Sequence, residues 1–272
     1  MQCLPHAFPD RTHLASALEG PWAACRATVA APAATEPALA VAAEVARMMA
    51  ACHADDPAAL QQLAEAGAAA ARTYPGSVHA LRMASAPLTA LRVSGHPPPA
   101  SVGTFDSALA AVLTHLDSPS QAVRVEALRL LSCFEAPSTS HGPCRAFASL
   151  LAVEAGPCTL EAGRRGVAAL GQLKADVEFK RVPPSLAGAV ARGLCGVLHV
   201  RFAVLWAPAA AALAAAVGHL GDEAWGVVAR HVKEAQGAFL RGEGVAGAGT
   251  QVQVRQRGGG RCCYANAGEG RE

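Results

Sequence analysis

The amino-acid sequence predicts an all-α protein in which antiparallel helix pairs stack side by side, an α-solenoid. Of its 272 residues, 52% are hydrophobic but only 4% are aromatic, and much of the apolar content is alanine, the best helix former. Helix start signals recur at short intervals, and one segment has the spacing of a helix-turn-helix unit. Helices with one apolar face must pack on neighbours to be stable, which favours a stack of pairs.

Helix start signals define an N-terminal helical segment, residues 1–94. A cap side chain accepts an unpaired backbone N–H, and a proline in the first turn has no N–H to lose. These signals predict helices from Glu36 to about Cys52 after Thr35, from Pro57 to about Tyr74 after Asp56, and from Ser77 onward, with Pro87 expected to bend or end the last one. Three consecutive prolines predict a linker at residues 95–103.

A denser helical block is predicted over residues 104–241. The expected helices cover residues 104–116, 120–135, 143–154, 159–174, 184–202, 207–220 and 222–240, and Asp222 caps the last one. In the second helix, one face is apolar: Val123, Ala127, Leu130 and Phe134. The opposite face is expected to be mostly solvated: Arg124, Glu126, Arg129 and Ser132. Residues 242–272 are rich in glycine and arginine without periodicity, so this tail is expected to be disordered.

The most informative segment follows the apolar stretch Leu109–Leu116. It contains an aspartate, a proline two residues later, and then apolar and basic residues at helical intervals: Asp117, Pro119, Val123, Arg124, Ala127 and Leu131. This spacing is typical of a HEAT repeat, a helix pair that builds extended binding scaffolds. The arginine at the position of Arg124 commonly bonds within the turn or to the adjacent repeat.

Three segments of the block resemble the DRIM family, very large nucleolar HEAT-repeat proteins of the small-subunit processome. Leu116–Phe134 is similar to the family repeat L-x-H-P-S-H-x-I-R-x-x-T-L-R-I-L. Val153–Arg164 is similar to its acidic-Pro-Ser/Thr-Leu…Arg segment, and Gly193–Pro208 to G-x-L-x-x-x-F-x-x-L-W-x-P, with Trp225 after an alanine-rich helix. The family's proteins are much longer, so the chain is expected to be a fragment or a truncated gene product.

The resemblance implies a non-catalytic scaffold in small-subunit ribosome biogenesis, located in the nucleolus. Processome proteins and pre-ribosomal RNA are the implied partners, with no cofactor, small-molecule substrate or membrane. The resemblance also implies a structural bend between two stacked helices, with the indole of Trp206 filling the angle. The residues of this bend are Phe202, Leu205, Trp206 and Pro208.

Basic residues of the block are candidates for RNA or partner contact, with ordinary solvated helix faces as the alternative. The candidates are Arg129, Arg164, Arg165, Lys180 and Arg181. The net charge of +2 supplies no global attraction to nucleic acid, so any basic surface must be local.

The sequence gives little support for an enzyme. The glycine spacing at 242–247 follows a predicted helix instead of a strand, so it does not predict a dinucleotide site. Candidate metal ligands are Cys195 with His199, and the looser group Cys133, His141 and Cys144. The carboxylates are expected at helix starts or on exposed faces: Glu126, Glu154, Glu161 and Asp222.

Nine scattered cysteines, an odd number, favour a reducing compartment. The stretch from Phe202 to Gly218 is mostly alanine and is too short to favour a membrane span. Two alternatives stay open. One is a general HEAT-repeat adaptor of the transport or phosphatase-scaffold type, which a partner list would identify. The other is an enzyme with a Cys/His metal centre, which elemental analysis would reveal.

Overall fold

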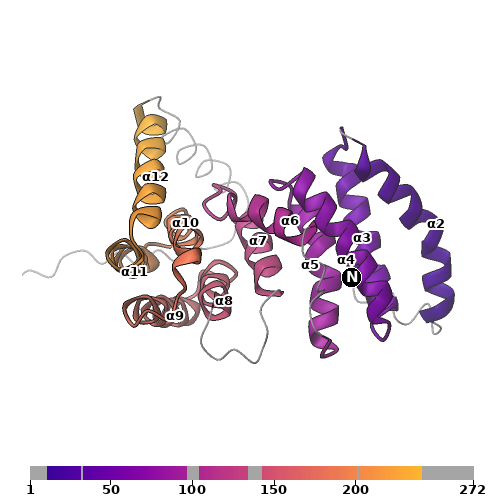
Figure 1. Cartoon of the computed structure of the whole chain (residues 1–272), viewed down its shortest axis with the longest axis horizontal. Helices are drawn as coiled ribbons and strands as arrows, with labels where there is room; N and C mark the ends of the chain where they lie inside the picture. Colours follow the sequence, from indigo (N-terminus) through magenta and orange to yellow (C-terminus); the bar gives the residue numbers. More distant parts are fainter. Residues whose placement is uncertain (1–10, 32, 97–103, 134–142, 201, 241–272) are drawn as a thin grey trace, which may run out of the picture. The chain divides into compact units, whose positions relative to one another are not determined.

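The computed structural model describes residues 11–31, 33–96, 104–133, 143–200 and 202–240, with the backbone alone at 104–106, 143–144 and 238–239. Within these residues the structure is helical and has no strand (Figure 1). The α-helices are α2 (Arg11–Ala30), α3 (Glu36–Cys52), α4 (Pro57–Thr73), α5 (Val78–Val93), α6 (Thr104–Leu113), α7 (Gln121–Cys133), α8 (Pro143–Glu154), α9 (Leu160–Glu178), α10 (Ala187–Val197), α11 (Trp206–Leu220) and α12 (Asp222–Leu240). Two short 3₁₀ turns, η1 (Pro184–Leu186) and η2 (Ala203–Leu205), precede α10 and α11.

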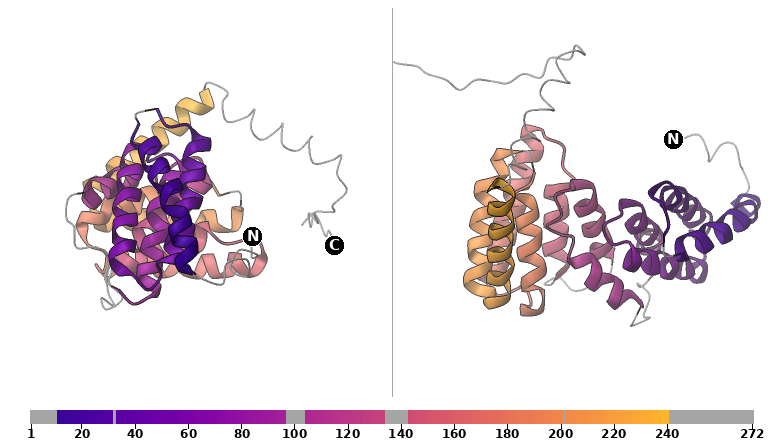
Figure 2. Two further views of the ribbon diagram at one scale, coloured as in Figure 1. Left: turned by 90° about the vertical axis from the view of Figure 1, so that its right-hand side faces the viewer. Right: turned by 90° about the horizontal axis from the view of Figure 1, so that it is seen from above.

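The chain divides into two compact units, residues 1–228 and 229–272. Inside the first unit, most helices pack on the next helix, and many also pack on the helix two positions along the chain. The second kind of neighbour joins α3 to α5, α5 to α7, α4 to α6, α8 to α10, and α9 to α11. Two further views show these neighbours from the side and from above (Figure 2). Such a succession of packed helices is consistent with an α-solenoid.

Several helices begin where the sequence predicts, because the cap side chains form. Asp56 accepts the backbone N–H groups of Ala58 and Ala59 at 3.0 and 3.1 Å. Ser77 and Thr159 accept N–H groups three residues ahead, at the starts of α5 and α9. Thr35 precedes α3 without a side-chain cap bond, so the proline in the first turn is the effective start signal there.

Two features of the N-terminal helices differ from the sequence prediction. Helix α2 was not predicted, since it has no first-turn acid and carries Pro21 in its interior. Helix α5 runs through Pro87 to Val93, so this proline does not end it. Proline has no N–H to bond the carbonyl four residues back, here that of Met83. The backbone of Gly67 in α4 lies directly against this carbonyl, where any added Cβ would collide with it.

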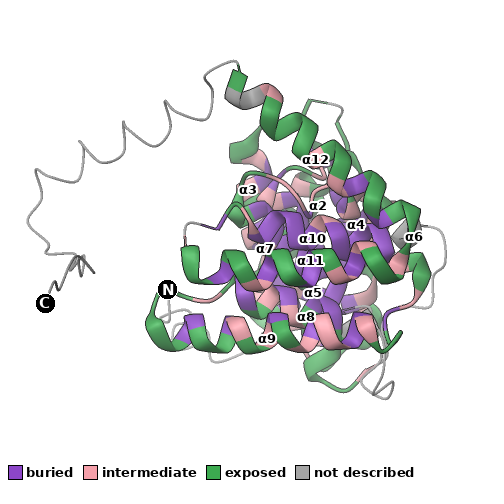
Figure 3. Cartoon of the chain, turned by 90° about the vertical axis from the view of Figure 1, so that its left-hand side faces the viewer, coloured by how far each residue is buried: buried purple, intermediate pink, exposed green. Residues whose placement is uncertain are grey.

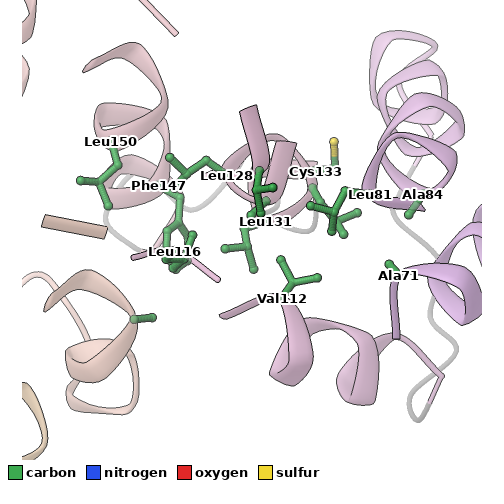
Figure 4. Close-up of a cluster of buried hydrophobic side chains, with 14 of the residues drawn as sticks. Ala71, Leu81, Ala84, Val112, Leu116, Leu128, Leu131, Cys133, Phe147 and Leu150 are labelled. Atoms are coloured by element: carbon green, nitrogen blue, oxygen red, sulfur yellow. The ribbon is translucent and has the colours of Figure 1, made fainter. Parts of the chain in front are cut away.

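The core is built largely of alanine and leucine and continues from α2 to the first turns of α12. One part of it brings together Leu81 of α5, Val112 of α6, Leu131 of α7 and Phe147 of α8 (Figure 4). Along α9 and α11, buried and exposed residues alternate (Figure 3). The small side chains allow neighbouring helices to approach closely, and burial of leucines between them provides most of the apolar stabilisation.

Some sequence predictions lie outside the described residues. These are most of the proline-rich linker (97–103) and the whole tail (242–272). Of the second unit, the described part is the end of α12, residues 229–240, whose described side chains are exposed or half-buried.

Candidate binding surface

The arginine of the repeat motif forms a fully buried ion pair. Arg124 of α7 donates through Nε and Nη2 to the two carboxylate oxygens of Glu154 at 2.7 and 2.9 Å. Both side chains are 1% exposed. Arg124 Nη1 also donates to the carbonyl oxygen of Ser118 in the preceding turn, at 2.6 Å. The guanidinium therefore joins the turn before α7 to the last residue of α8, and a two-point pair of this kind fixes their relative position.

Helix α10 covers this ion pair. A Cβ on Gly196 would collide with the carbonyl oxygen of Leu116 and would lie 2.7 Å from Cδ of Arg124, so the α10 backbone touches both groups. One turn earlier on α10, Arg192 donates to Asp117 at 3.3 Å. The motif residues divide into two sets: Val123, Ala127 and Leu131 are buried in the core, while Asp117 is half-buried and Pro119 is exposed. The motif thus positions the α6–α7, α8 and α10 segments.

The prediction that the carboxylates occupy helix starts or exposed faces was wrong for Glu126 and Glu154, which are both buried. Arg124 and Ser132 are buried as well, so the face of α7 expected in solvent is largely covered. The reason is tertiary: α5, α8 and α10 all pack on α7. A carboxylate can be buried there because an arginine reaches it from a neighbouring helix or turn.

The bend before α11 packs on two glycines of α9. Phe202 lies against Gly163 and Leu205 against Gly166, where an added Cβ would come within 2.6 and 2.8 Å of the two side chains. Trp206 donates its indole N–H to the carbonyl of Val200 at 2.8 Å, but the residue is 46% exposed. Phe202 and Leu205, and not the indole, therefore fill the angle, while Pro208 is half-buried in the first turn of α11.

The five candidate contact residues do not gather on one surface. Arg164 and Arg165 are exposed near the start of α9, and Arg165 lies 3.8 Å from Glu161. Lys180 and Arg181 follow the end of the same helix, roughly 20 Å away along its axis. Arg129 lies on α7 and donates to Glu126 at 2.8 Å.

The corner after α9 combines an exposed aromatic ring with basic side chains. Phe179 is 70% exposed, and the guanidinium of Arg181 lies 5.4 Å from the centre of its ring. Arg181 also donates to the buried Asp176 at 3.1 Å, and Arg145 of α8 lies 3.6 Å from the same carboxylate. Asp176 thus pairs with two exposed arginines, one of which, Arg181, lies over the ring.

Lys180 occupies an unfavourable backbone conformation in this corner. Its φ is +55°, a left-handed value that glycine usually supplies at the end of a helix. The N–H groups of Lys180 and Arg181 bond the carbonyls of Val177 and Asp176, as in a Schellman cap. A lysine at such a position has a conformational cost, which suggests that its side chain has a role outside folding.

An open groove of about 590 Å³ crosses helices α3, α5 and α7. Small side chains line part of it: Ala40, Ala43, Ser85, Ala86 and Thr89. His79 of α5 and charged side chains from all three helices line the rest: Glu44, Arg47, Arg82, Glu126 and Arg129. The groove was not predicted from the sequence, because its helices are separated by other segments and no local pattern connects them.

The charges in this groove are paired unequally. Arg82 and Arg129 donate to the same oxygen of Glu126, Oε1, at 2.9 and 2.8 Å. The Glu126 side chain is 3% exposed, whereas those of Arg82 and Arg129 are 51% and 50% exposed. On α3, Arg47 bonds both carboxylate oxygens of Glu44. This hydrogen bond lowers the pKa of Glu44, and the charge of Arg82 lowers it further. Three arginines in the groove therefore face two glutamates, and Glu126 is buried beneath Arg82 and Arg129.

The cysteines and histidines do not assemble into a metal centre among the described residues, where no group of three or more candidate ligands occurs. Cys195 is buried and His199 is exposed, and burial raises the pKa of the Cys195 thiol to about 12. His141 and the side chain of Cys144 lie outside the described residues. One helical stretch, Ala203–Leu220, has the length and hydropathy of a membrane span. Helix α11, which occupies most of it, packs on α9 and α10.

Comparison with protein-family models, with curated proteins and with solved structures gives no match. The resemblance to the DRIM family therefore rests on the three sequence segments alone.

Proposed function

We propose that this chain is a non-catalytic helical-repeat scaffold that contributes to small-subunit ribosome biogenesis in the nucleolus. The resemblance of residues 116–134, 153–164 and 193–208 to the DRIM family supplies the biological setting. The observation that carries the RNA-binding part of the proposal is the corner formed by Phe179, Lys180 and Arg181.

This corner has the chemistry of a single-stranded RNA contact. An exposed aromatic ring can stack on a base, and neighbouring cations can contact the phosphates on either side. Asp176 orients Arg181, so this guanidinium is held at the ring before any ligand binds, and Arg145 lies against the same carboxylate. Lys180 adds a further positive charge at this corner, in a left-handed conformation that glycine would adopt at less cost.

Substitution at the corner tests RNA binding by the purified chain. Phe179→Ser removes the stacking ring, and Lys180→Gly removes one charge while relieving the left-handed backbone. Lys180→Gly is expected to stabilise the fold by about 1 kcal/mol and to weaken binding of single-stranded RNA. Arg72→Gln removes an exposed charge from the end of α4 and serves as the matched control. Unchanged RNA affinity in both corner variants would remove this part of the proposal.

The ribosomal setting has its own test in cells. The tagged chain is expected in the nucleolus, and in sucrose gradients it should sediment with small-subunit precursors. Ribonuclease treatment should release part of it if RNA contributes to the association. A diffuse cytosolic signal with no precursor association would contradict the assignment.

A general HEAT-repeat adaptor is the second candidate, and the α3–α5–α7 groove favours it. A groove lined by charged side chains from three alternate helices is the kind of surface on which a repeat scaffold receives another protein. The partner list separates the two candidates. Affinity purification dominated by transport cargo or phosphatase subunits, without ribosomal precursors, would select the adaptor.

A further inference from the structure

We infer that the α3–α5–α7 groove binds an acidic segment of a partner protein. The inference deepens the proposed function, because it rests on the chain acting as a scaffold. It assigns a partner chemistry to a surface that overlaps the segments of the ribosomal resemblance only at Glu126 and Arg129. Three features of the groove support it: its surplus of cations, the way the arginines are held, and the small side chains between them.

The arginines retain hydrogen-bonding capacity toward a ligand. Arg82 reaches Glu126 through Nε alone, and Arg129 through Nη1 alone. Most N–H groups of both guanidiniums therefore have no protein partner among the described residues and face water or a ligand. Both side chains are half-exposed over the buried carboxylate of Glu126, so a ligand in the groove can still reach them. A partner carboxylate can accept two parallel N–H bonds from such a group.

The cations are held in place before a partner arrives. Glu126 anchors Arg82 and Arg129 to one oxygen, which links α5 to α7. Glu44 anchors Arg47 on α3 in the same manner. Anchoring lowers the conformational entropy that an arginine loses when it binds, so more of the interaction energy contributes to affinity. The three guanidiniums come from three packed helices and provide successive positions for carboxylates across the groove.

The lining between the arginines fits a protein segment better than nucleic acid. Ala40, Ala43 and Ala86 leave room for short apolar side chains between the charges. No Phe, Tyr or Trp is among the described residues that line the groove, so bases would have no ring to stack on. Glu44 and Glu126 also line the groove and repel any anion, but an evenly spaced row of phosphates cannot avoid them. Separate carboxylates on a peptide can instead contact the arginines individually.

Fluorescence anisotropy with the full chain provides the test. The probe is a labelled peptide of alternating glutamate and alanine, compared with a glutamine–alanine peptide of equal length and with oligouridylate of equal charge. The glutamate peptide is expected to bind, and its affinity should fall as salt is raised, because the guanidiniums are partly exposed. Equal binding of the glutamine peptide would overturn the inference. So would tighter binding of oligouridylate that depends on the groove arginines.

Two variants assign the binding to the groove. Arg47→Gln leaves only the half-exposed Glu44 without its partner, so the fold should hold, and peptide affinity should fall about tenfold, as for loss of one charge-assisted hydrogen bond. The triple variant Arg82→Gln, Glu126→Gln, Arg129→Gln replaces the buried carboxylate and both arginines by neutral amides, which can still bond to one another. Its loss of peptide affinity is expected to be larger than that of Arg47→Gln. Circular dichroism shows whether each variant is folded. If the triple variant does not fold, the peptide affinity of Arg47→Gln tests the inference.

The matched control is Arg26→Gln with Arg72→Gln, which removes exposed charge from α2 and α4, outside the groove. This control is expected to bind the glutamate peptide like the native chain. An equal loss in the control and in the groove variants would show that binding follows total charge, and the inference would fail. Failure here leaves the nucleolar assignment standing, because precursor association in cells is measured without the peptide.

Discussion

Helices α4 and α5 are joined by close backbone packing, whereas α7, α8 and α10 are joined by a buried ion pair. In the first region Gly67 lies against the backbone of Met83 and Ala84. In the second, Arg124 and Glu154 are fully buried and bonded at two points. Backbone packing depends on shape and tolerates no added atom, while the ion pair depends on both partners. The same helical architecture is therefore vulnerable to different substitutions in its two regions.

The groove lies across the junction of these regions. Helix α5 belongs to the first region and α3 packs on it, whereas α7 belongs to the second. The ion pair of Glu126 with Arg82 connects α7 to α5. A surface of this kind exists only when both regions are folded and packed on each other. Changes in either region are therefore expected to reach the groove.

The largest effect is expected for breaking the buried pair. Glu154→Ala leaves the Arg124 guanidinium buried without a counter-charge, so the free energy of unfolding should fall by about 3–5 kcal/mol. Urea denaturation followed by circular dichroism measures this. Replacing both residues with apolar ones, Arg124→Met with Glu154→Leu, should restore most of the loss. The exposed pair Arg165 and Glu161 is the control, where Glu161→Ala should cost no more than about 1 kcal/mol.

The next effect belongs to the closely packed region. Gly67→Ala places a methyl group against the Met83 carbonyl, and α4 and α5 must move apart at a cost of about 1–3 kcal/mol. Gly171→Ala in α9 has no atom within 4 Å of the added carbon. Its helix propensity should therefore raise stability by up to about 1 kcal/mol. The melting temperature should fall for Gly67→Ala and rise for Gly171→Ala. Equal shifts would show that backbone contact does not limit the packing of α4 on α5.

Helix caps should have a smaller effect. Asp56 bonds two N–H groups at the start of α4, so Asp56→Ala should cost about 1 kcal/mol. Thr35→Ala should cost only a few tenths, roughly 0.3 kcal/mol, because Thr35 makes no cap hydrogen bond. Chemical denaturation distinguishes the two. A cost for Thr35→Ala as large as that for Asp56→Ala would mean that the threonine acts through another contact.

The smallest effect is expected at the exposed pair on α3. Arg47 lowers the pKa of Glu44 in the folded protein. A carboxyl with a lowered folded-state pKa adds stability above its unfolded pKa, and this contribution disappears as the pH falls through the folded value. At neutral pH, Glu44→Gln should cost less than about 1 kcal/mol because the pair is half-exposed. In strong acid, Glu44→Gln and the native chain should have the same free energy of unfolding. A difference in this free energy that persists in acid would contradict the ion-pair explanation.

The sequence predicted the helical class and most helix starts, because caps such as Asp56 and Ser77 act locally. It did not predict α2, which lacks a first-turn acid and contains Pro21. The continuation of α5 through Pro87 depends on packing by α4, which no local pattern reveals. Buried carboxylates were missed for the same reason: periodicity assigns charged residues to solvent, whereas Glu126 and Glu154 are neutralised by arginines distant in the sequence or one helix away.

Hydrogen–deuterium exchange of the intact chain with the glutamate–alanine peptide tests most directly whether a scaffold surface spans the two regions. Added peptide should slow exchange in α3, α5 and α7 together, and leave α9 and α11 unchanged. Protection confined to α9 or α11, or no protection in the three groove helices, would contradict a docking surface built across them.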